Sequence, residues 1–337
     1  MQRPAAHIDR ATLLTVFLVA GISMTIGWGP IIGAKARPLT ARKFERTPKR
    51  VERVRYIFMG LSGCVHCHSP LEKSQRGFPP VLSMMGAGQV LIEEASLGRI
   101  VAPNLTPDMQ TGSGAWTDDQ LARAIREGIG HDGRTLFPMM PYQNFRSMSD
   151  EDLASVVVFL RSLPAIRHDL PKTTIAFPVK YLIKGLPQPV TSPVNAPVAS
   201  DCVQWGNYLV RMANCADCHT VRGADGKPIR GMDFAGGMSI HMERVTSAGA
   251  NLTPDASGIP YYNEALFIRT LRRGTVGARE LSSLMPFVVY RNLSDDDLQA
   301  IFAYLQTLKP VHHRVDNSLP PTYCRLCRHK HGAGDQN

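Results

Sequence analysis

The sequence predicts a mostly α-helical protein, made of two similar units that follow an N-terminal transmembrane helix. Three observations support this prediction. One series of short motifs occurs twice, capped helices with an apolar stripe lie in both copies, and residues 11–33 carry no charged side chain. No strand-like alternation of any length is found, so no substantial sheet is expected.

Each copy contains the motif Cys-x-x-Cys-His, at residues 64–68 and again at residues 215–219. Two thiols one helical turn apart can form thioethers to the vinyl groups of one haem, and the adjacent histidine then binds the iron. The predicted attachment residues are Cys64, Cys67, Cys215 and Cys218, and the predicted axial ligands are His68 and His219. A zinc site made of the four thiolates is the rival interpretation, but it leaves both histidines unexplained.

A methionine followed by proline stands at the matching place in each copy and predicts the second axial ligand. The first cysteine precedes Met140 by 76 residues and Met285 by 70, and both methionines precede a Ser-Asp-x-Asp-Leu segment by nine residues. Met139 lacks both the following proline and this spacing. A thioether is a soft ligand that raises the potential of haem iron. The alternative is that Met140 and Met285 are ordinary core residues.

Helix signals recur between and after these motifs. A capping box at Thr117-x-x-Gln120 begins one amphipathic helix, which Gly128 ends. Its counterpart runs from Asn263 to Gly274, and Ser-x-x-Asp caps at residues 149–152 and 294–297 begin the last helix of each unit. Each unit is therefore predicted to be a small helical domain around one haem.

The chain resembles the membrane-bound cytochrome c subunits, and related cytochromes, that accompany bacterial periplasmic alcohol and aldehyde dehydrogenases. The resemblance rests on both haem motifs, on Asn-Leu-Thr-Pro-Asp at residues 104–108 and 251–255, and on the segments at residues 111–116, 140–142 and 149–153. It implies two tandem cytochrome c-type helical haem domains. Members of that family carry three haem units, whereas this chain has two. Copy two also lacks the Thr-Gly-x-Gly-x-Trp of residues 111–116, so its haem surroundings are expected to differ.

The expected domain organisation follows from these motifs and from composition. The predicted parts are a membrane anchor (1–33), a basic juxtamembrane segment (34–50), cytochrome c domain 1 (51–164), a Pro-rich linker (165–200), cytochrome c domain 2 (201–310) and a Cys-containing tail (311–337).

Residues 11–33 are long enough to span a membrane, and they exceed the apolar region of an ordinary signal peptide. We therefore favour an uncleaved anchor in the cytoplasmic membrane of a bacterium over a cleaved signal peptide. Haem attachment then places the domains in the periplasm, although a positive-inside count gives the opposite orientation.

Net charge is concentrated beside the anchor. Residues 34–55 sum to +7 and residues 1–33 to +1, so the remaining residues hold only +2 of the total of +10. The basic segment is expected to lie on anionic lipid headgroups, or else to be a solvated linker. The high pI therefore requires no nucleic-acid partner.

The tail contains a second type of Cys-x-x-Cys pair, Cys324 and Cys327. Arg328 stands where a haem ligand would be needed, so a third haem is not expected. A disulfide between the two cysteines is the first expectation outside the cytoplasm. The alternative is a small metal site with His329 or His331, and with Cys202 as a further candidate ligand.

Two haems with saturated irons predict an electron-transfer protein rather than an enzyme. Electrons would pass between a dehydrogenase or a quinol-linked reductase and a terminal oxidase or soluble cytochrome. The alternative is a dihaem enzyme of the peroxidase type with one open iron site. A structural or sensory subunit is a third possibility.

Overall fold

The computed structural model describes residues 35–223, 226–242, 244–332 and 334. The predicted transmembrane helix over residues 11–33 lies outside these ranges. None of the helices in the described ranges is both long and apolar enough to cross a membrane.

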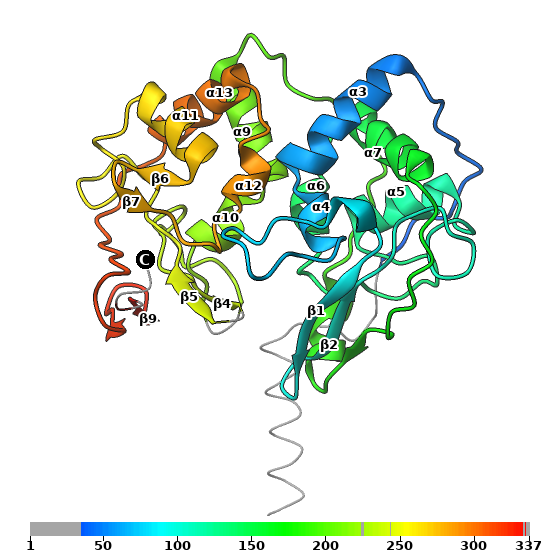
Figure 1. Cartoon of the computed structure of the whole chain (residues 1–337), viewed down its shortest axis with the longest axis horizontal. Coiled ribbons are helices and arrows are strands. Elements are labelled where there is room, and N and C mark those ends of the chain that lie inside the picture. The colour runs from blue at the N-terminus through cyan, green and yellow to red at the C-terminus, as the bar shows by residue number, and fades with distance from the viewer. Residues whose placement is uncertain (1–34, 224–225, 243, 333, 335–337) are drawn as a thin grey trace, which may run out of the picture.

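The two copies form two adjacent lobes (Figure 1), here called unit one (residues 51–164) and unit two (residues 201–310). Unit one and its entry contain α3 (Pro48–Tyr56), η1 (Ile57–Leu61), α4 (Cys64–Cys67), η2 (Leu82–Met84), β1 (Gln89–Glu94), β2 (Gly98–Ala102), α5 (Asp118–Glu127), α6 (Tyr142–Phe145) and α7 (Asp150–Ser162). Unit two contains α9 (Cys202–Met212), α10 (Cys215–His219), β4 (Ser239–Met242), β5 (Val245–Ala248), α11 (Glu264–Arg273), β6 (Thr275–Val276), β7 (Arg279–Glu280), α12 (Phe287–Tyr290) and α13 (Asp295–Gln306).

The first and last long helices of each unit pack against each other, α3 on α7 and α9 on α13, and α5 and α11 pack beside the last helices. Their caps are those that the sequence predicts. Thr117 and Gln120 form a complete capping box, and Ser149 and Ser294 accept hydrogen bonds from backbone amides three residues later. One cluster of buried apolar side chains, including Phe58, Leu160, Leu209 and Leu305, runs through both units.

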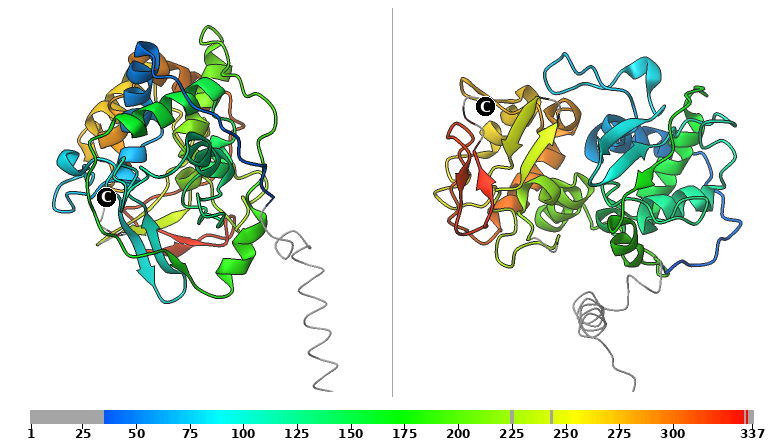
Figure 2. Two further views of the ribbon diagram at one scale, coloured as in Figure 1. Left: turned by 90° about the vertical axis from the view of Figure 1, so that its right-hand side faces the viewer. Right: turned by 90° about the horizontal axis from the view of Figure 1, so that it is seen from below.

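The expectation of a fold without appreciable strands is wrong. β1 and β2 form an antiparallel hairpin, to which β3 (Thr174–Ile175) adds a third strand, and β4 pairs with β5 at the matching place in unit two. Figure 2 shows both hairpins from below. Gly98 has φ +89°, and a Cβ there would lie 2.1 Å from the Thr174 carbonyl oxygen. These short strands are held by pairing and a glycine turn, and they lack the alternation that marks a half-buried strand.

The Pro-rich linker is partly ordered against unit one. Besides β3 it contains α8 (Val179–Leu182) and η3 (Ile183–Gly185), and Ile183 is buried. Farther along, the Val194 carbonyl accepts a hydrogen bond of 2.8 Å from the Asp150 amide at the start of α7. The tail contains β8 (Thr322–Tyr323) and β9 (Lys330–His331), which pair with each other.

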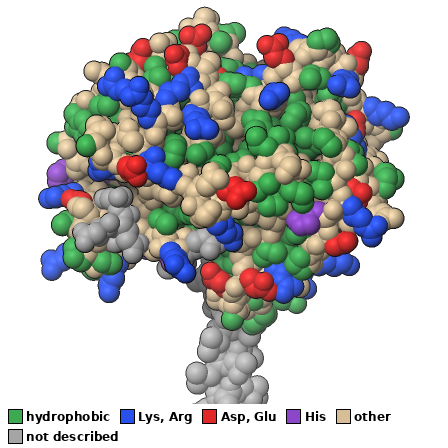
Figure 3. All heavy atoms as spheres, viewed as in Figure 1, with side chains coloured by type: hydrophobic (Ala, Val, Ile, Leu, Met, Phe, Trp, Pro, Cys, Tyr) green, Lys and Arg blue, Asp and Glu red, His purple; other side chains and the backbone are tan. Residues whose placement is uncertain are grey.

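The basic segment before unit one is engaged with the protein itself. Arg37 forms ion pairs of 2.7 Å with both Asp119 and Glu127, and the Phe44 amide donates to Asp118 on the same helix. Arg50 is paired with Glu151 at 2.8 Å. Part of the charge that we expected to face lipid is therefore neutralised by unit one. On the face shown in Figure 3, basic and acidic side chains are interspersed.

Candidate functional site

Each Cys-x-x-Cys-His motif lies on a short helix that begins directly after a left-handed residue. Gly63 has φ +58° before α4, and Asn214 has φ +56° before α10. This conformation turns the chain sharply away from the preceding helix, and glycine and asparagine tolerate it best. The four motif thiols form no disulfide with one another, and they do not gather into one metal cluster within the described ranges. The rival zinc site made of both motifs is therefore not assembled.

The two motif histidines are buried and held in the same way. His68 is bonded through Nδ1 to the Pro103 carbonyl at 3.0 Å, and His219 through Nδ1 to the Ala250 carbonyl at 2.7 Å. Burial lowers the pKa of both imidazoles, which keeps them neutral. A neutral imidazole that donates from Nδ1 leaves the lone pair on Nε2 to bind a metal. Unpaired thiols beside such a histidine fit the covalent attachment of haem.

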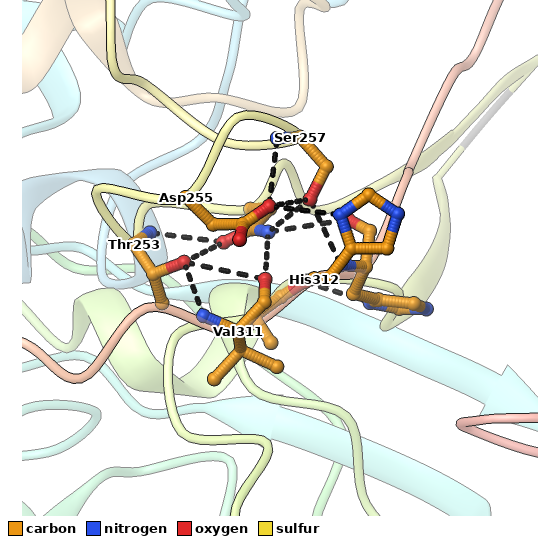
Figure 4. A network of polar contacts seen from close by, with 8 residues as sticks. Thr253, Asp255, Ser257, Val311 and His312 are labelled. Atoms are coloured by element: carbon orange, nitrogen blue, oxygen red, sulfur yellow. Dashed lines mark hydrogen bonds and ion pairs between the residues drawn. The ribbon is translucent and has the colours of Figure 1, made fainter.

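The Asn-Leu-Thr-Pro-Asp segments hold the loops near these histidines. In unit one, the Asn104 Oδ1 accepts hydrogen bonds from the Thr106 amide (3.0 Å) and hydroxyl (2.7 Å), while its Nδ2 donates to the Ile166 carbonyl (2.8 Å). Asn251 makes the same contacts with Thr253 and with the Val311 carbonyl. Figure 4 shows the unit-two network, in which Asp255 also holds Ser257. These segments tie each loop to the chain beyond the last helix.

The unit-two surroundings differ less than the missing Thr-Gly-x-Gly-x-Trp segment predicts. Gly258 takes the place of Gly112, because a Cβ at either residue would lie 2.2 Å from a threonine carbonyl oxygen. Ser257 bonds to Asp255 much as Thr111 bonds to Asp108. The difference that remains is Trp116, which stacks on His131 with ring centroids 4.2 Å apart.

The two predicted methionine ligands occupy equivalent places. Met140 and Met285 are partly buried, pack against the hydrophobic core and directly precede the Pro that begins α6 or α12. Met139 is 43% exposed, and that distinguishes it from its neighbour. The assignment of Met140 and Met285 as iron ligands stays a prediction.

The haem motif of each unit lies against the other unit. The Asn144 Nδ2 in α6 donates to the Oδ1 of Asn214, which immediately precedes Cys215, at 2.9 Å. In the opposite direction, a Cβ on Gly63 would lie 3.5 Å from Val289 of α12. Accordingly, α4 and α10 both lie toward the middle of the molecule in Figure 1. The sequence shows two motifs, but their juxtaposition depends on how the units pack.

Two tyrosines cross the boundary in opposite directions, a feature that sequence reasoning missed. The Tyr208 hydroxyl donates to Asp152 at 2.6 Å and accepts from the Ser149 amide at 3.1 Å. The Tyr56 hydroxyl bonds to Asp297 and accepts from the Ser294 amide. Each tyrosine therefore caps the start of the other unit's last helix. The repeat of a tyrosine before each haem motif was the available signal.

Comparisons with known proteins agree with the repeat. A family model for cytochrome c matches residues 51–164 and 203–309. A nicotinate dehydrogenase component of Pseudomonas putida is 33% identical over 181 residues, which are 49% of this chain and 15% of the relative. The cytochrome c subunit of the alcohol dehydrogenase (quinone) of Gluconobacter oxydans is 29% identical, with 74% of this chain and 53% of the relative covered. A diheme cytochrome c-type protein of Cereibacter sphaeroides is 28% identical, with 74% and 83% covered. The chain thus spans about half or less of the first two relatives.

Proposed function

The chain belongs to the cytochrome c family, and we propose that it transfers electrons through two covalently bound haems, one in each unit. Cys64, Cys67, His68 and Met140 hold the first haem, and Cys215, Cys218, His219 and Met285 hold the second. A haem iron in such a site supplies a one-electron change of valence.

The observation that carries the proposal is the matched environment of the two motif histidines. In both units a backbone carbonyl fixes Nδ1, which presents Nε2 as a ligand, and the core excludes water from the imidazole. The juxtaposition of each motif with the other unit supports electron exchange within the molecule. A methionine at the same place in both units leaves no position reserved for peroxide, which disfavours the peroxidase alternative.

Dehydrogenases are the electron donors that we propose, since relatives are named as subunits of alcohol, fructose and gluconate dehydrogenases. A quinol-linked reductase is the second candidate donor, and a terminal oxidase or soluble cytochrome is the acceptor. We further propose a periplasmic location, with residues 11–33 as the anchor in the cytoplasmic membrane. The Cys-x-x-Cys-His motif and the uncharged length of that segment support this location.

Haem counting and redox titration of the full-length protein test the proposal. A pyridine haemochrome assay with intact mass should give two haems per chain, and a titration should give two one-electron steps. The reduced protein should pass electrons to an oxidised soluble c-type cytochrome and should not bind carbon monoxide. Peroxide turnover with a high-spin resting spectrum would contradict electron transfer as the function.

A further inference from the structure

Four side chains with metal-binding atoms meet where the tail folds back onto unit two. They are His313, Cys324, Cys327 and His331, and their nitrogen and sulfur atoms all lie within 4.8 Å of one another. The Cys324 Sγ lies 3.4 Å from the His313 Nε2. The two cysteines are free thiols, so the expected disulfide is not formed. Among the described residues, no other group of three or more His, Cys, Asp or Glu side chains gathers in this way.

The local fold brings both cysteines to one point. The Cys324 amide donates to the His329 carbonyl at 2.8 Å, and the Arg328 amide donates to the Cys324 carbonyl at 2.9 Å. Arg328 is left-handed, with φ +59°, and so the chain reverses directly after Cys327. The following strand β9 then returns His331 to the two thiols. The tail's Cys-x-x-Cys spacing therefore forms a tight turn with both sulfurs on one side.

His313 comes from outside this turn and is oriented before any ligand binds. Its Nδ1 is bonded to the Ala235 carbonyl at 2.8 Å, and its amide donates to the Ser257 hydroxyl at 2.8 Å. Donation from Nδ1 leaves the lone pair on Nε2, the atom that faces Cys324. A hydrogen bond from the other ring nitrogen to a backbone carbonyl is a usual support of a metal-binding histidine.

The cluster is also closed to solvent. His313 and Cys327 are fully buried, and the Nε2 of His331 is buried without a hydrogen-bond partner. A buried polar atom that lacks a partner is uncommon in folded proteins and calls for an unseen ligand or an ion. A disulfide would engage only the two sulfurs and would leave both imidazoles unsatisfied.

We propose that His313, Cys324, Cys327 and His331 bind one zinc ion as a tetrahedral structural site. Zn–S bonds of about 2.3 Å and Zn–N bonds of about 2.0 Å place tetrahedral donors about 3.3–3.8 Å apart, so the observed cluster needs little contraction. Two thiolates also balance the charge of Zn²⁺, and two sulfurs with two imidazoles in tetrahedral geometry favour zinc over magnesium or calcium. The site does not depend on the proposed electron-transfer function.

The ligand set differs from the alternative that the tail sequence suggests. His329 points away, because its Nε2 is bonded to the Arg222 carbonyl at 2.7 Å, and Cys202 is exposed at the start of α9. His331 belongs to the set, and His313 was missed. The signal for His313 was its spacing, since Ser149 to His168 and Ser294 to His313 are both 19 residues.

Unit one contains the same histidine without the site. His168 bonds through Nδ1 to the Ala87 carbonyl at 2.9 Å, and its amide donates to the Thr111 hydroxyl at 3.0 Å. No cluster of metal-binding side chains forms around His168 within the described ranges. The zinc site is therefore an addition to unit two, supplied by the tail, and His168 provides a matched control.

The position of the site indicates what the ion stabilises. His313 is bonded to Ala235, and the next residue, Gly236, donates from its amide to the His219 carbonyl at 2.8 Å. Cys327 packs with Val221 and Met232 on the same loop. A zinc ion here would fasten the tail to the loop that follows the second haem motif.

Metal analysis of the full-length haem protein, expressed in zinc-containing medium, tests the proposal. Mass spectrometry of the elements should find one zinc per chain in addition to the haem iron. C324S/C327S and H331A should each lower the zinc content at least about tenfold, while C202S and H168A should leave it unchanged. X-ray absorption at the zinc edge should show two sulfur and two nitrogen ligands.

Two results would overturn the proposal. The first is a protein without zinc whose Cys324 and Cys327 resist alkylation until reduced, which is the behaviour of a disulfide. The second is a different metal at one equivalent on the same four residues. Because haem content is measured in parallel, a variant that simply fails to fold is recognised by loss of both haem and zinc, and H331A and C324S/C327S are compared only when their haem content is intact.

Discussion

Replacing Tyr208 with phenylalanine should weaken the joint between the units, because the hydroxyl makes two buried contacts. It donates to Asp152 at 2.6 Å and accepts from the Ser149 amide at 3.1 Å, and Tyr208 and Ser149 are 5% and 4% exposed. A hydrogen bond to a charged group contributes about 1.5–3 kcal/mol, and a buried amide left without a partner costs about 1–3 kcal/mol.

The phenylalanine ring keeps the packing, and Asp152 keeps its ion pair with Arg53 at 2.8 Å. We therefore expect Y208F to lower the free energy of unfolding by about 2–4 kcal/mol. Y56F is the matched variant in the other direction. Its cost should be smaller, about 1–2 kcal/mol, because Tyr56 is only partly buried and Asp297 keeps a 2.6 Å hydrogen bond from Trp205.

Urea unfolding followed by far-UV circular dichroism and by haem absorbance gives both free energies. The measurement has a second readout in pH, since burial, reinforced by Asp152, raises the pKa of Tyr208 far above its ordinary value of 10.0. A raised folded-state pKa stabilises the fold below the unfolded-state pKa, and this contribution is lost as pH rises above about 10. The difference between wild type and Y208F should therefore shrink above about pH 10. A Y208F cost under about 0.5 kcal/mol at pH 7 would refute the reasoning.

Two further predictions concern unit one. M140A should lower the potential of one haem and open its iron to carbon monoxide, whereas M139A, at a residue 43% exposed, should leave the spectrum intact, and optical redox titration distinguishes the two. R37Q should destabilise the fold by about 3 kcal/mol at pH 7, because it leaves the buried carboxylate of Asp119 without its cation, while K43Q at an exposed site should change the urea midpoint little. Equal carbon monoxide binding by M140A and M139A, or equal midpoints for R37Q and K43Q, would contradict these predictions.

Local signals in the sequence were sufficient for the helices and for the haem motifs. Caps such as Ser149 and the glycine stop at Gly128 act within a few residues, so they can be recognised without tertiary structure. The covalent attachment motif is equally local. By contrast, the β1–β2 hairpin depends on pairing across a turn at Gly98, and neither of its strands alternates apolar and polar residues.

Contacts between distant segments could not be predicted from the repeat alone. The tyrosines that cap the opposite unit are separated from their aspartates by 56 and 241 residues. The cluster at His313 likewise joins residues from beyond α13 and from both strands of the tail hairpin, whereas Cys202, the odd cysteine of the sequence, lies elsewhere. Which residues meet is decided by how the loops cross, and one sequence carries little of that information.

The one-residue mismatch between the repeats has a structural cause. Tyr56 precedes Cys64 by eight residues and Tyr208 precedes Cys215 by seven. The π-helix η1 lies between Tyr56 and Cys64, where the Ser62 amide bonds to the Ile57 carbonyl five residues back. A single π-turn absorbs one extra residue without ending the helix. The insertion therefore leaves both tyrosines able to reach the equivalent aspartate.

The two units differ most in how their outer ends are fastened. In unit one, the preceding segment docks on α5 through Arg37, which requires the carboxylates of Asp119 and Glu127. The corresponding residues of α11 are Ala265 and Arg273, which cannot form those ion pairs. Unit two instead receives the tail, which has only two-residue strands and a small apolar cluster of its own. A segment with so little core requires another source of stability, and a zinc ion held by four side chains would supply it. The repeated haem unit is thus closed by an ion-paired segment at the start of the pair and by the proposed metal site at its end.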